Sequence, residues 1–192
     1  NFRRMLNDFS SNQSAELTET SPAVKALFDY AEAHVSGAMY FELGKVLYEQ
    51  GQYPLAKQDY ELARDHDLLR FRAPMDTNDV IRELANQEGV ILVDANAQLD
   101  AAAENGVIGL DLMLEHLHPN VKGYFEVSDA FYHSLHQSKV LGAFPKVIST
   151  EQARKEIPVL AAEEYYGKAK LAELESDYPF QNQPKRVLLP RA

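Results

Sequence analysis

The chain has 192 residues and a formal net charge of −10, with 19 Lys plus Arg against 29 Asp plus Glu. It therefore lacks the excess of positive charge that binding to a nucleic-acid backbone requires. It has no cysteine, which excludes disulfides and thiolate metal sites, and no apolar run approaches the roughly 20 residues of a membrane span. Hydrophobic residues make up 45% of the chain, enough for the core of one domain or one and a half.

The first 21 residues predict an N-terminal segment that ends in a loop, because residues 10–20 are rich in Ser, Asn, Thr and Glu. Ser21 and Pro22 then have the pattern of an N-cap followed by proline at the first helical position. A helix is expected from there to about Val35. Its apolar positions share one face: Val24, Leu27, Phe28 and Ala31.

The next stretch has the spacing of a tetratricopeptide repeat. Nine positions agree: Tyr40, Leu43, Gly44, Leu47, Gly51, Tyr53, Ala56, Tyr60 and Ala63. The small residues among them predict two antiparallel helices in close approach, joined by a turn at 50–52. One repeat cannot bury its own apolar face, so the 22–35 helix and a downstream element should cap it. Its tyrosines are either core residues or the lining of a peptide-binding groove.

A helix is expected over 77–88, capped by Asp76 or Thr77 and stopped at Gly89 in a left-handed conformation. Its inward face is predicted to consist of Val80, Ile81, Leu84 and Ala85. Residues 90–93 are a continuous aliphatic run ending at Asp94, a pattern typical of a buried parallel strand. Shorter and longer helices should follow over 96–103, 120–136 and 159–175, with an Asn105-Gly106 turn after the first and a Pro-rich, extended tail after the last.

A single parallel strand has no partners for its backbone hydrogen bonds. Buried and unpaired, those groups would each cost roughly 1–3 kcal/mol. The partner strands must come from unrecognised sequence, from another chain or from polypeptide upstream of Asn1. We expect the last of these.

The most informative stretch runs over 115–120, Glu-His-Leu-His-Pro-Asn. Glu115 stands three residues before His118, and a proline and a helix follow that histidine directly. A carboxylate that orients an imidazole is two members of a nucleophilic triad, and the third member would be a serine. From spacing alone, Glu115 and His118 are more readily interpreted as a solvated surface pair near the start of a helix.

The order of these elements resembles the C-terminal part of an SGNH (GDSL-type) hydrolase that carries a tetratricopeptide insertion. The segments that carry the resemblance are 63–65 with 69–74, Asn78 with Ile81 and Arg82, 92–94, and 115–120 with Gly123 and Tyr124. The resemblance implies that His118 is the general base and Glu115 its orienting acid, although the family has Asp at the acid position. No Gly-Asp-Ser nucleophile block and no oxyanion-hole block are found, so the chain is interpreted as a fragment of such an enzyme.

The expected fold is therefore mainly α. Tetratricopeptide-like helical hairpins would be joined to the C-terminal edge of an α/β flavodoxin-like SGNH fold, with one short parallel strand and flanking helices. The expected divisions are an N-terminal segment (1–21), the helical insertion (22–75), the hydrolase part (76–138) and a C-terminal extension (139–192). The resemblance implies an acyl-ester substrate, on a carbohydrate or a lipid, and no cofactor. The alternative is a helical module that binds a peptide or protein without catalysis.

Other residues leave two readings each. Arg70 and Arg72 flank Phe71 and either recognise an anion or pair with Asp65, Asp67 or Glu61. Asp94 is either a functional group at the end of the strand or the cap of the next helix. A metal site built from His116 and His118 with His133 or His136 is conceivable, but no third ligand has a compelling spacing.

Overall fold

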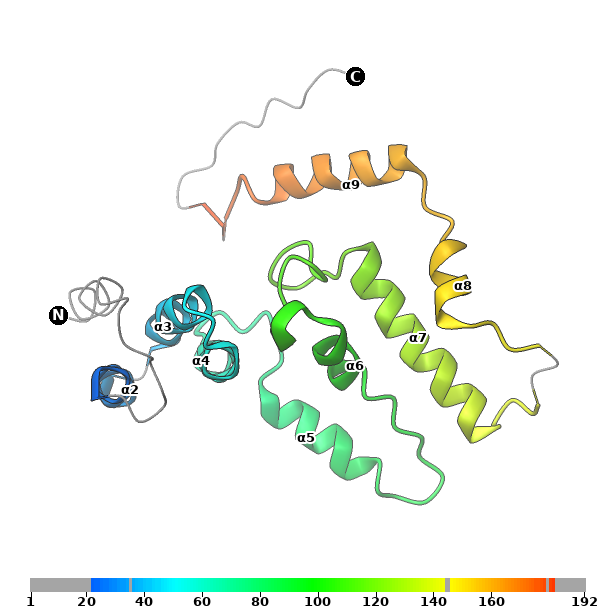
Figure 1. Cartoon of the computed structure of the whole chain (residues 1–192), viewed down its shortest axis with the longest axis horizontal. Coiled ribbons are helices and arrows are strands. Elements are labelled where there is room, and N and C mark those ends of the chain that lie inside the picture. The colour runs from blue at the N-terminus through cyan, green and yellow to red at the C-terminus, as the bar shows by residue number, and fades with distance from the viewer. Residues whose placement is uncertain (1–21, 35, 144–145, 179, 182–192) are drawn as a thin grey trace. The chain divides into compact units, whose positions relative to one another are not determined.

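In the computed structural model, residues 22–34, 36–143, 146–178 and 180–181 are described. Helices are the only regular elements of that part, so the mainly α prediction is confirmed (Figure 1). The chain divides into two compact units, residues 1–143 and 144–192. None of the described helices is long and apolar enough to cross a membrane.

The predicted helical hairpin is present. α2 (Pro22–His34) precedes α3 (Gly37–Glu49) and α4 (Tyr53–Asp65), which pack together as an antiparallel pair joined by a turn with Gly51 at φ 75° (Figure 1). Ser21, the predicted N-cap, and the side chains of the predicted inner face of α2 lie outside the described residues.

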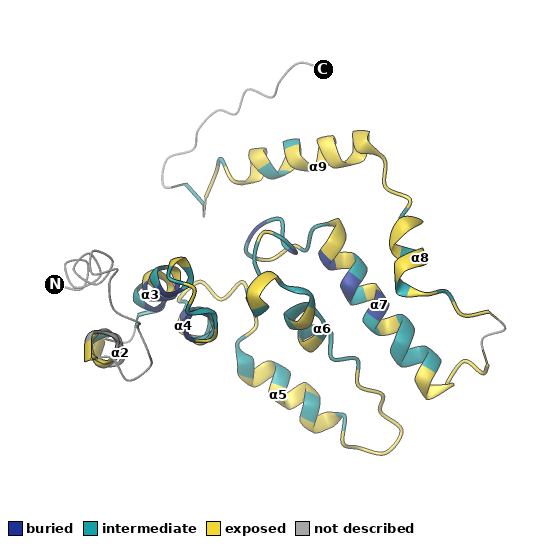
Figure 2. Cartoon of the chain, viewed as in Figure 1, coloured by how far each residue is buried: buried dark blue, intermediate teal, exposed yellow. Residues whose placement is uncertain are grey.

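The hairpin holds most of the core. Buried positions lie on the facing sides of α3 and α4 (Figure 2), and the buried apolar residues of the described chain are Tyr40, Leu43, Leu47, Leu55, Ala56, Ala63 and Leu112. The helices approach closely, as predicted, because a Cβ on Gly44 would lie 3.0 Å from the ring of Tyr60. Asp59 is also fully buried on α4, and neither of its carboxylate oxygens is hydrogen-bonded to any described residue.

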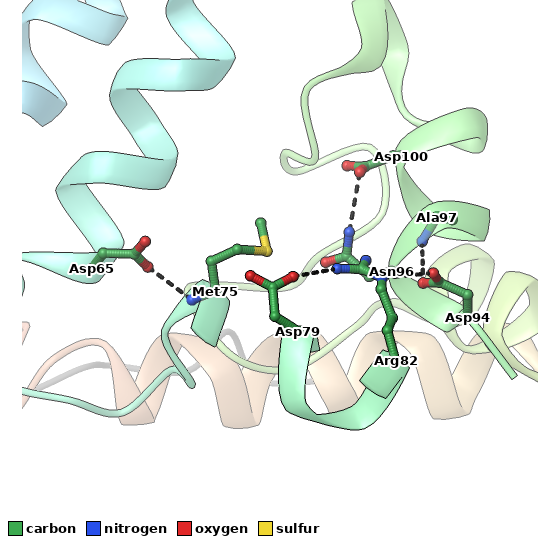
Figure 3. Close-up of polar contacts among 8 residues, drawn as sticks. All are labelled: Asp65, Met75, Asp79, Arg82, Asp94, Asn96, Ala97 and Asp100. Atoms are coloured by element: carbon green, nitrogen blue, oxygen red, sulfur yellow. Dashed lines mark hydrogen bonds and ion pairs between the residues drawn. The ribbon is translucent and has the colours of Figure 1, made fainter. Parts of the chain in front are cut away.

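The helix expected over 77–88 begins and ends earlier in the chain, and the prediction that its apolar face is buried is wrong. α5 spans Met75–Leu84 with Pro74, rather than Asp76 or Thr77, at the N-cap. It begins earlier because Oδ1 of Asp65 accepts the backbone N–H of Met75 at 3.1 Å, which satisfies a donor that the first turn leaves open (Figure 3). None of its residues is buried, and the predicted inward residues Val80, Ile81 and Leu84 are about half exposed.

The strand expected over 90–93 is not formed. The segment has no regular secondary structure after Gly89, which has the predicted left-handed φ of 82°, and it belongs to no ladder in the described part of the chain. Val90, Ile91 and Leu92 are 48%, 42% and 39% exposed. The physical reason is the one that the sequence raised, since a strand needs a neighbour to receive its backbone hydrogen bonds.

Side-chain hydrogen bonds of Arg82 connect the end of α5 to the start of α6 (Ala95–Ala102). Its Nε donates to Asp94 Oδ2 at 3.0 Å and its Nη1 to Asp79 Oδ1 at 3.1 Å (Figure 3). Asp94 also accepts the backbone N–H of Ala97 at 3.0 Å and is the N-cap of α6. Both contacts lower the pKa of Asp94, that with Arg82 most, and they support the capping interpretation of this residue.

The remaining elements of the first unit are close to prediction. A 3₁₀ turn, η1 (Glu104–Gly106), contains Asn105 and Gly106 at positive φ, and α7 spans Val121–Ser138. Polar contacts join these elements to the hairpin, with Lys57 Nζ 2.9 Å from Asp100 Oδ2 and Asn105 Nδ2 donating to the Tyr48 hydroxyl at 3.2 Å. α6 packs on α7, and Gln98 Nε2 donates to the buried Glu126 at 3.0 Å.

The second unit contains α8 (Thr150–Lys155), which was not predicted, and α9 (Ala161–Leu174), which matches the helix expected over 159–175. Ser149 caps α8 by accepting the backbone N–H of Gln152 at 3.2 Å. Most of the predicted extended tail, 182–192, lies outside the described residues.

Candidate active site

The candidate site lies at the tip of a closed loop between Leu112 and Asn120. The backbone N–H of Asn120 donates to the carbonyl of Leu112 at 2.9 Å, and that of Leu114 donates to the carbonyl of His118 at 2.7 Å. An isolated antiparallel bridge joins Met113 and Pro119 between these bonds. The two limbs hold residues 115–117 at the turn.

The loop is fixed to the start of α7. Asn120 is the N-cap, and its Oδ1 accepts the backbone N–H of Gly123 at 3.0 Å, as expected of a residue that sets the start of this helix. Its Nδ2 donates to the carbonyl of Leu110 at 3.2 Å. Gly123 is needed for close packing, since a Cβ there would lie 2.1 Å from the carbonyl oxygen of Leu112. Gly123 thus lets the first turn of α7 pack on the loop carbonyl of Leu112.

Glu115 is the acceptor at the centre of the loop. Its side chain is 3% exposed. Oε1 accepts the backbone N–H of His118 at 2.8 Å, and Oε2 accepts that of Leu117 at 3.0 Å. Oε1 also contacts Nδ1 of His118, and Oε2 contacts Nδ1 of His116. A surface-pair interpretation would have left this carboxylate in water, whereas it is enclosed by donors.

These donors determine the charge of Glu115. Burial by itself raises the pKa of a carboxyl group, since it disfavours the charged form. The hydrogen bonds from the His118 ring and from the backbone N–H groups of His118 and Leu117, with the nearby His116, outweigh burial and leave the pKa of Glu115 below its usual range. The group is therefore ionised at neutral pH.

The side chain of His118 is exposed, in contrast to that of Glu115. It is 55% exposed although its Nδ1 contacts the buried carboxylate. Nε2 has no partner among the described residues and is the nitrogen left for chemistry. An imidazole oriented through Nδ1 with Nε2 free is the geometry that a general base needs.

His116, which also lies in this loop, contacts the candidate site in a way that the sequence did not predict. Its Nδ1 contacts the second oxygen of Glu115, without the alignment of a hydrogen bond. The ring of Phe71 lies against it edge-on, with centroids 5.4 Å apart. Proximity to Glu115 in the sequence was the one available signal for His116, and none existed for Phe71.

The open alternatives are partly resolved. Arg72 pairs with Asp67 at 3.8 Å, while Arg70 has no ion pair in the described chain. No group of three potential ligands that could hold a metal is found among the residues described. Asp111 accepts the backbone N–H of Glu104 at 2.9 Å and lies 3.8 Å from Lys122 Nζ, so it has a local structural role.

No serine hydroxyl contacts His118 among the residues that the structure describes. Comparisons with protein-family models, with curated proteins and with solved structures found no match to this chain. The geometry of Glu115 and His118 is therefore the main indication of function in this chain.

Proposed function

We propose that this chain supplies the base and the orienting acid of an SGNH-type serine hydrolase whose nucleophile lies on polypeptide outside these 192 residues. The observation that supports this most is the contact between the buried Glu115 and Nδ1 of an otherwise exposed imidazole. His118 would take the proton of the serine through Nε2, and Glu115 would hold the reactive tautomer. The substrate would be an acyl ester, on a carbohydrate or a lipid, in a hydrolase or acyltransferase reaction.

The proposal requires Glu115 to do what Asp does in the family, and the conformation of the loop allows this. A longer side chain moves its carboxylate by about 1 Å, an error that can cost about 10²-fold in rate. In this loop the Glu115 side chain turns back to accept two backbone N–H groups, which keeps Oε1 against the ring of His118. The acid thus retains its role despite the added methylene.

The segment 90–93 supports the proposal that a further part of the enzyme supplies the other strands of its sheet. The backbone N–H groups of Ile91, Leu92 and Val93 donate no hydrogen bond within the described chain, and α5 beside this segment leaves its apolar residues about half exposed. Strands added here would bury both surfaces. In the proposed parent enzyme, residues 90–93 form the edge strand of that sheet and α5 covers it.

The tetratricopeptide-like hairpin is proposed as an insertion in that enzyme. A peptide-binding groove would need accessible aromatic residues, whereas Tyr40 is 3% exposed and Tyr60 is partly buried where it packs over Gly44. This burial favours a structural role for these two tyrosines and gives a purely adaptor function less support.

The test uses a fluorophosphonate, which labels an activated serine. The 192-residue chain should stay unlabelled, because loss of the nucleophile costs on the order of 10⁶ in turnover. The chain joined to the polypeptide encoded upstream should be labelled, provided that this contains a Gly-Asp-Ser block. His118→Gln should abolish labelling, and the matched control His136→Gln on α7 should not.

Two results would contradict the proposed function. One is a serine adduct on the 192-residue chain alone. The other is a reading frame in which no Gly-Asp-Ser block precedes the chain.

A further inference from the structure

We propose that Leu69, Phe71 and Leu117 form an acyl-binding surface beside the candidate base His118, and that the ester hydrolysed there carries an apolar chain rather than an acetyl group. The inference rests on the proposed function, because the acyl group reaches this surface only when a serine holds it next to His118. It narrows the substrate from acyl esters in general to esters of medium or long alkyl chains.

The three side chains of the acyl-binding surface are exposed, and they come from two segments that meet at the candidate site. Leu69, Phe71 and Leu117 are 48%, 50% and 42% exposed. The ring of Phe71 contacts the ring of His116 with centroids 5.4 Å apart, and Leu117 lies in the sequence between His116 and His118. Exposed apolar side chains that gather beside a few polar groups are typical of a ligand site.

The backbone that carries these side chains is held by hydrogen bonds. The N–H of Phe71 donates to the carbonyl of Leu69 at 2.8 Å, and the N–H of Leu69 donates to Asp67 Oδ1 at 3.0 Å. In the other segment, the N–H of Leu117 donates to Glu115 Oε2 at 3.0 Å. Because these backbone positions are already fixed, less conformational entropy is lost when a ligand covers the side chains. The surface is therefore preorganised for binding.

The position of the surface indicates which ligand covers it. A serine that gives its proton to Nε2 of His118 must lie about 3 Å from that nitrogen. The acyl carbon bonded to that serine then lies next to the loop that carries Leu117. An alkyl chain extending from this carbon can cover Leu117 and continue toward Phe71, whereas an acetyl group ends at the reacting centre. The geometry thus favours a long acyl group.

The test uses the chain joined to the polypeptide encoded upstream, the same protein that is labelled with the fluorophosphonate. The value of kcat/KM is measured for p-nitrophenyl acetate and for p-nitrophenyl octanoate, which differ only in the length of the acyl chain. The readout is the ratio of the octanoate value to the acetate value. A substitution that merely disturbs His118 lowers both values alike and leaves this ratio unchanged.

The unmodified enzyme should prefer octanoate by about 50-fold or more, because each methylene that is buried contributes roughly fourfold to binding. Phe71→Ala and Leu117→Ala should each lower the ratio by about five- to tenfold. The matched control is Leu110→Ala, since Leu110 is another exposed apolar residue, 79% exposed, but precedes the closure of the loop at Leu112. That substitution should leave the ratio unchanged.

The proposal is wrong if the enzyme prefers acetate, or if neither Phe71→Ala nor Leu117→Ala changes the ratio. An unchanged ratio would mean that upstream polypeptide, rather than the acyl chain, covers the surface. Should Phe71→Ala fail to fold, Leu117→Ala decides alone, because it keeps the backbone hydrogen bond to Glu115.

The labelling separates the failure of this inference from that of the proposed function. Without a serine adduct on the joined chain, both proposals are wrong. An adduct together with an unchanged ratio refutes the acyl-binding surface and leaves the hydrolase function in place.

Discussion

Oε1 of Glu115 accepts the backbone N–H of His118 at 2.8 Å and contacts Nδ1 of the same residue's ring. One carboxylate oxygen thereby fixes both the backbone and the side chain of His118. The arrangement is local, since the two residues are three apart, and it depends on the loop closed by Leu112 and Asn120.

Glu115 should stabilise the loop in its ionised form. Glu115→Ala leaves two backbone N–H groups without an acceptor and should lower the free energy of unfolding by about 1–3 kcal/mol at pH 7. Because the folded-state pKa of Glu115 is lowered, its contribution is present above the unfolded pKa and is lost as pH falls through the folded pKa. Denaturant unfolding of both chains at pH 7 and at acid pH measures this. A difference that grows toward acid pH would contradict the account.

The pH dependence of stability contributed by Asp59 should have the opposite sign to that contributed by Glu115. Burial raises its pKa from 3.8 to about 7, so the folded state binds a proton more tightly than the unfolded state. Stability should therefore fall as pH rises from about 4 to about 7 and then level off. Asp59→Asn should remove that slope and raise the free energy of unfolding at pH 8 by roughly 2 kcal/mol.

The control for Asp59 is Glu42→Gln on the exposed side of α3, which should leave the pH dependence nearly unchanged. Thermal denaturation between pH 4 and pH 8 compares the three chains. An Asp59→Asn variant less stable at pH 8 than the unmodified chain would mean that the carboxylate has a favourable role.

Gly123 should not tolerate a side chain. A Cβ would meet the carbonyl oxygen of Leu112 at 2.1 Å, so Gly123→Ala must displace the loop or the first turn of α7, at about 1–3 kcal/mol. Gly167→Ala is the matched control, because nothing lies within 4 Å of its Cβ position on α9. That change should stabilise α9 by roughly 0.5–1 kcal/mol. Equal effects of the two substitutions in denaturant unfolding would refute the close-packing interpretation.

Residues 91–93 should exchange their amide hydrogens rapidly in this chain. Ile91, Leu92 and Val93 donate no backbone hydrogen bond in the described structure, so hydrogen exchange should be close to that of an unprotected chain. The amides of α3, such as those of Leu43 and Leu47, provide the protected reference. Strong protection of 91–93 in the isolated chain would show that the segment already has a partner.

The hairpin could be predicted because its information is local. Large and small residues such as Tyr60 and Gly44 recur at helical spacing, and the Gly51 turn lies between them. The Glu115–His118 contact was predictable for the same reason, since a short loop brings residues three apart together.

What failed depended on distant parts of the chain. The periodicity of Val80, Ile81 and Leu84 correctly indicated a helix, but whether that face is buried depends on a neighbour that the described residues do not supply. Residues 90–93 likewise have strand-forming side chains, but they belong to no ladder within the part of the chain that the structure describes. The contact between Phe71 and His116 joins segments 45 positions apart, and no feature of the sequence predicted it.

The most direct measurement is the protonation of the two ring nitrogens of His118, read from their 15N chemical shifts in the labelled chain at neutral pH. We expect one tautomer, with the proton on Nδ1 beside Glu115 and no proton on Nε2. A proton on Nε2, or shifts averaged between the two tautomers, would contradict the claim that Glu115 holds this imidazole ready to act as a base.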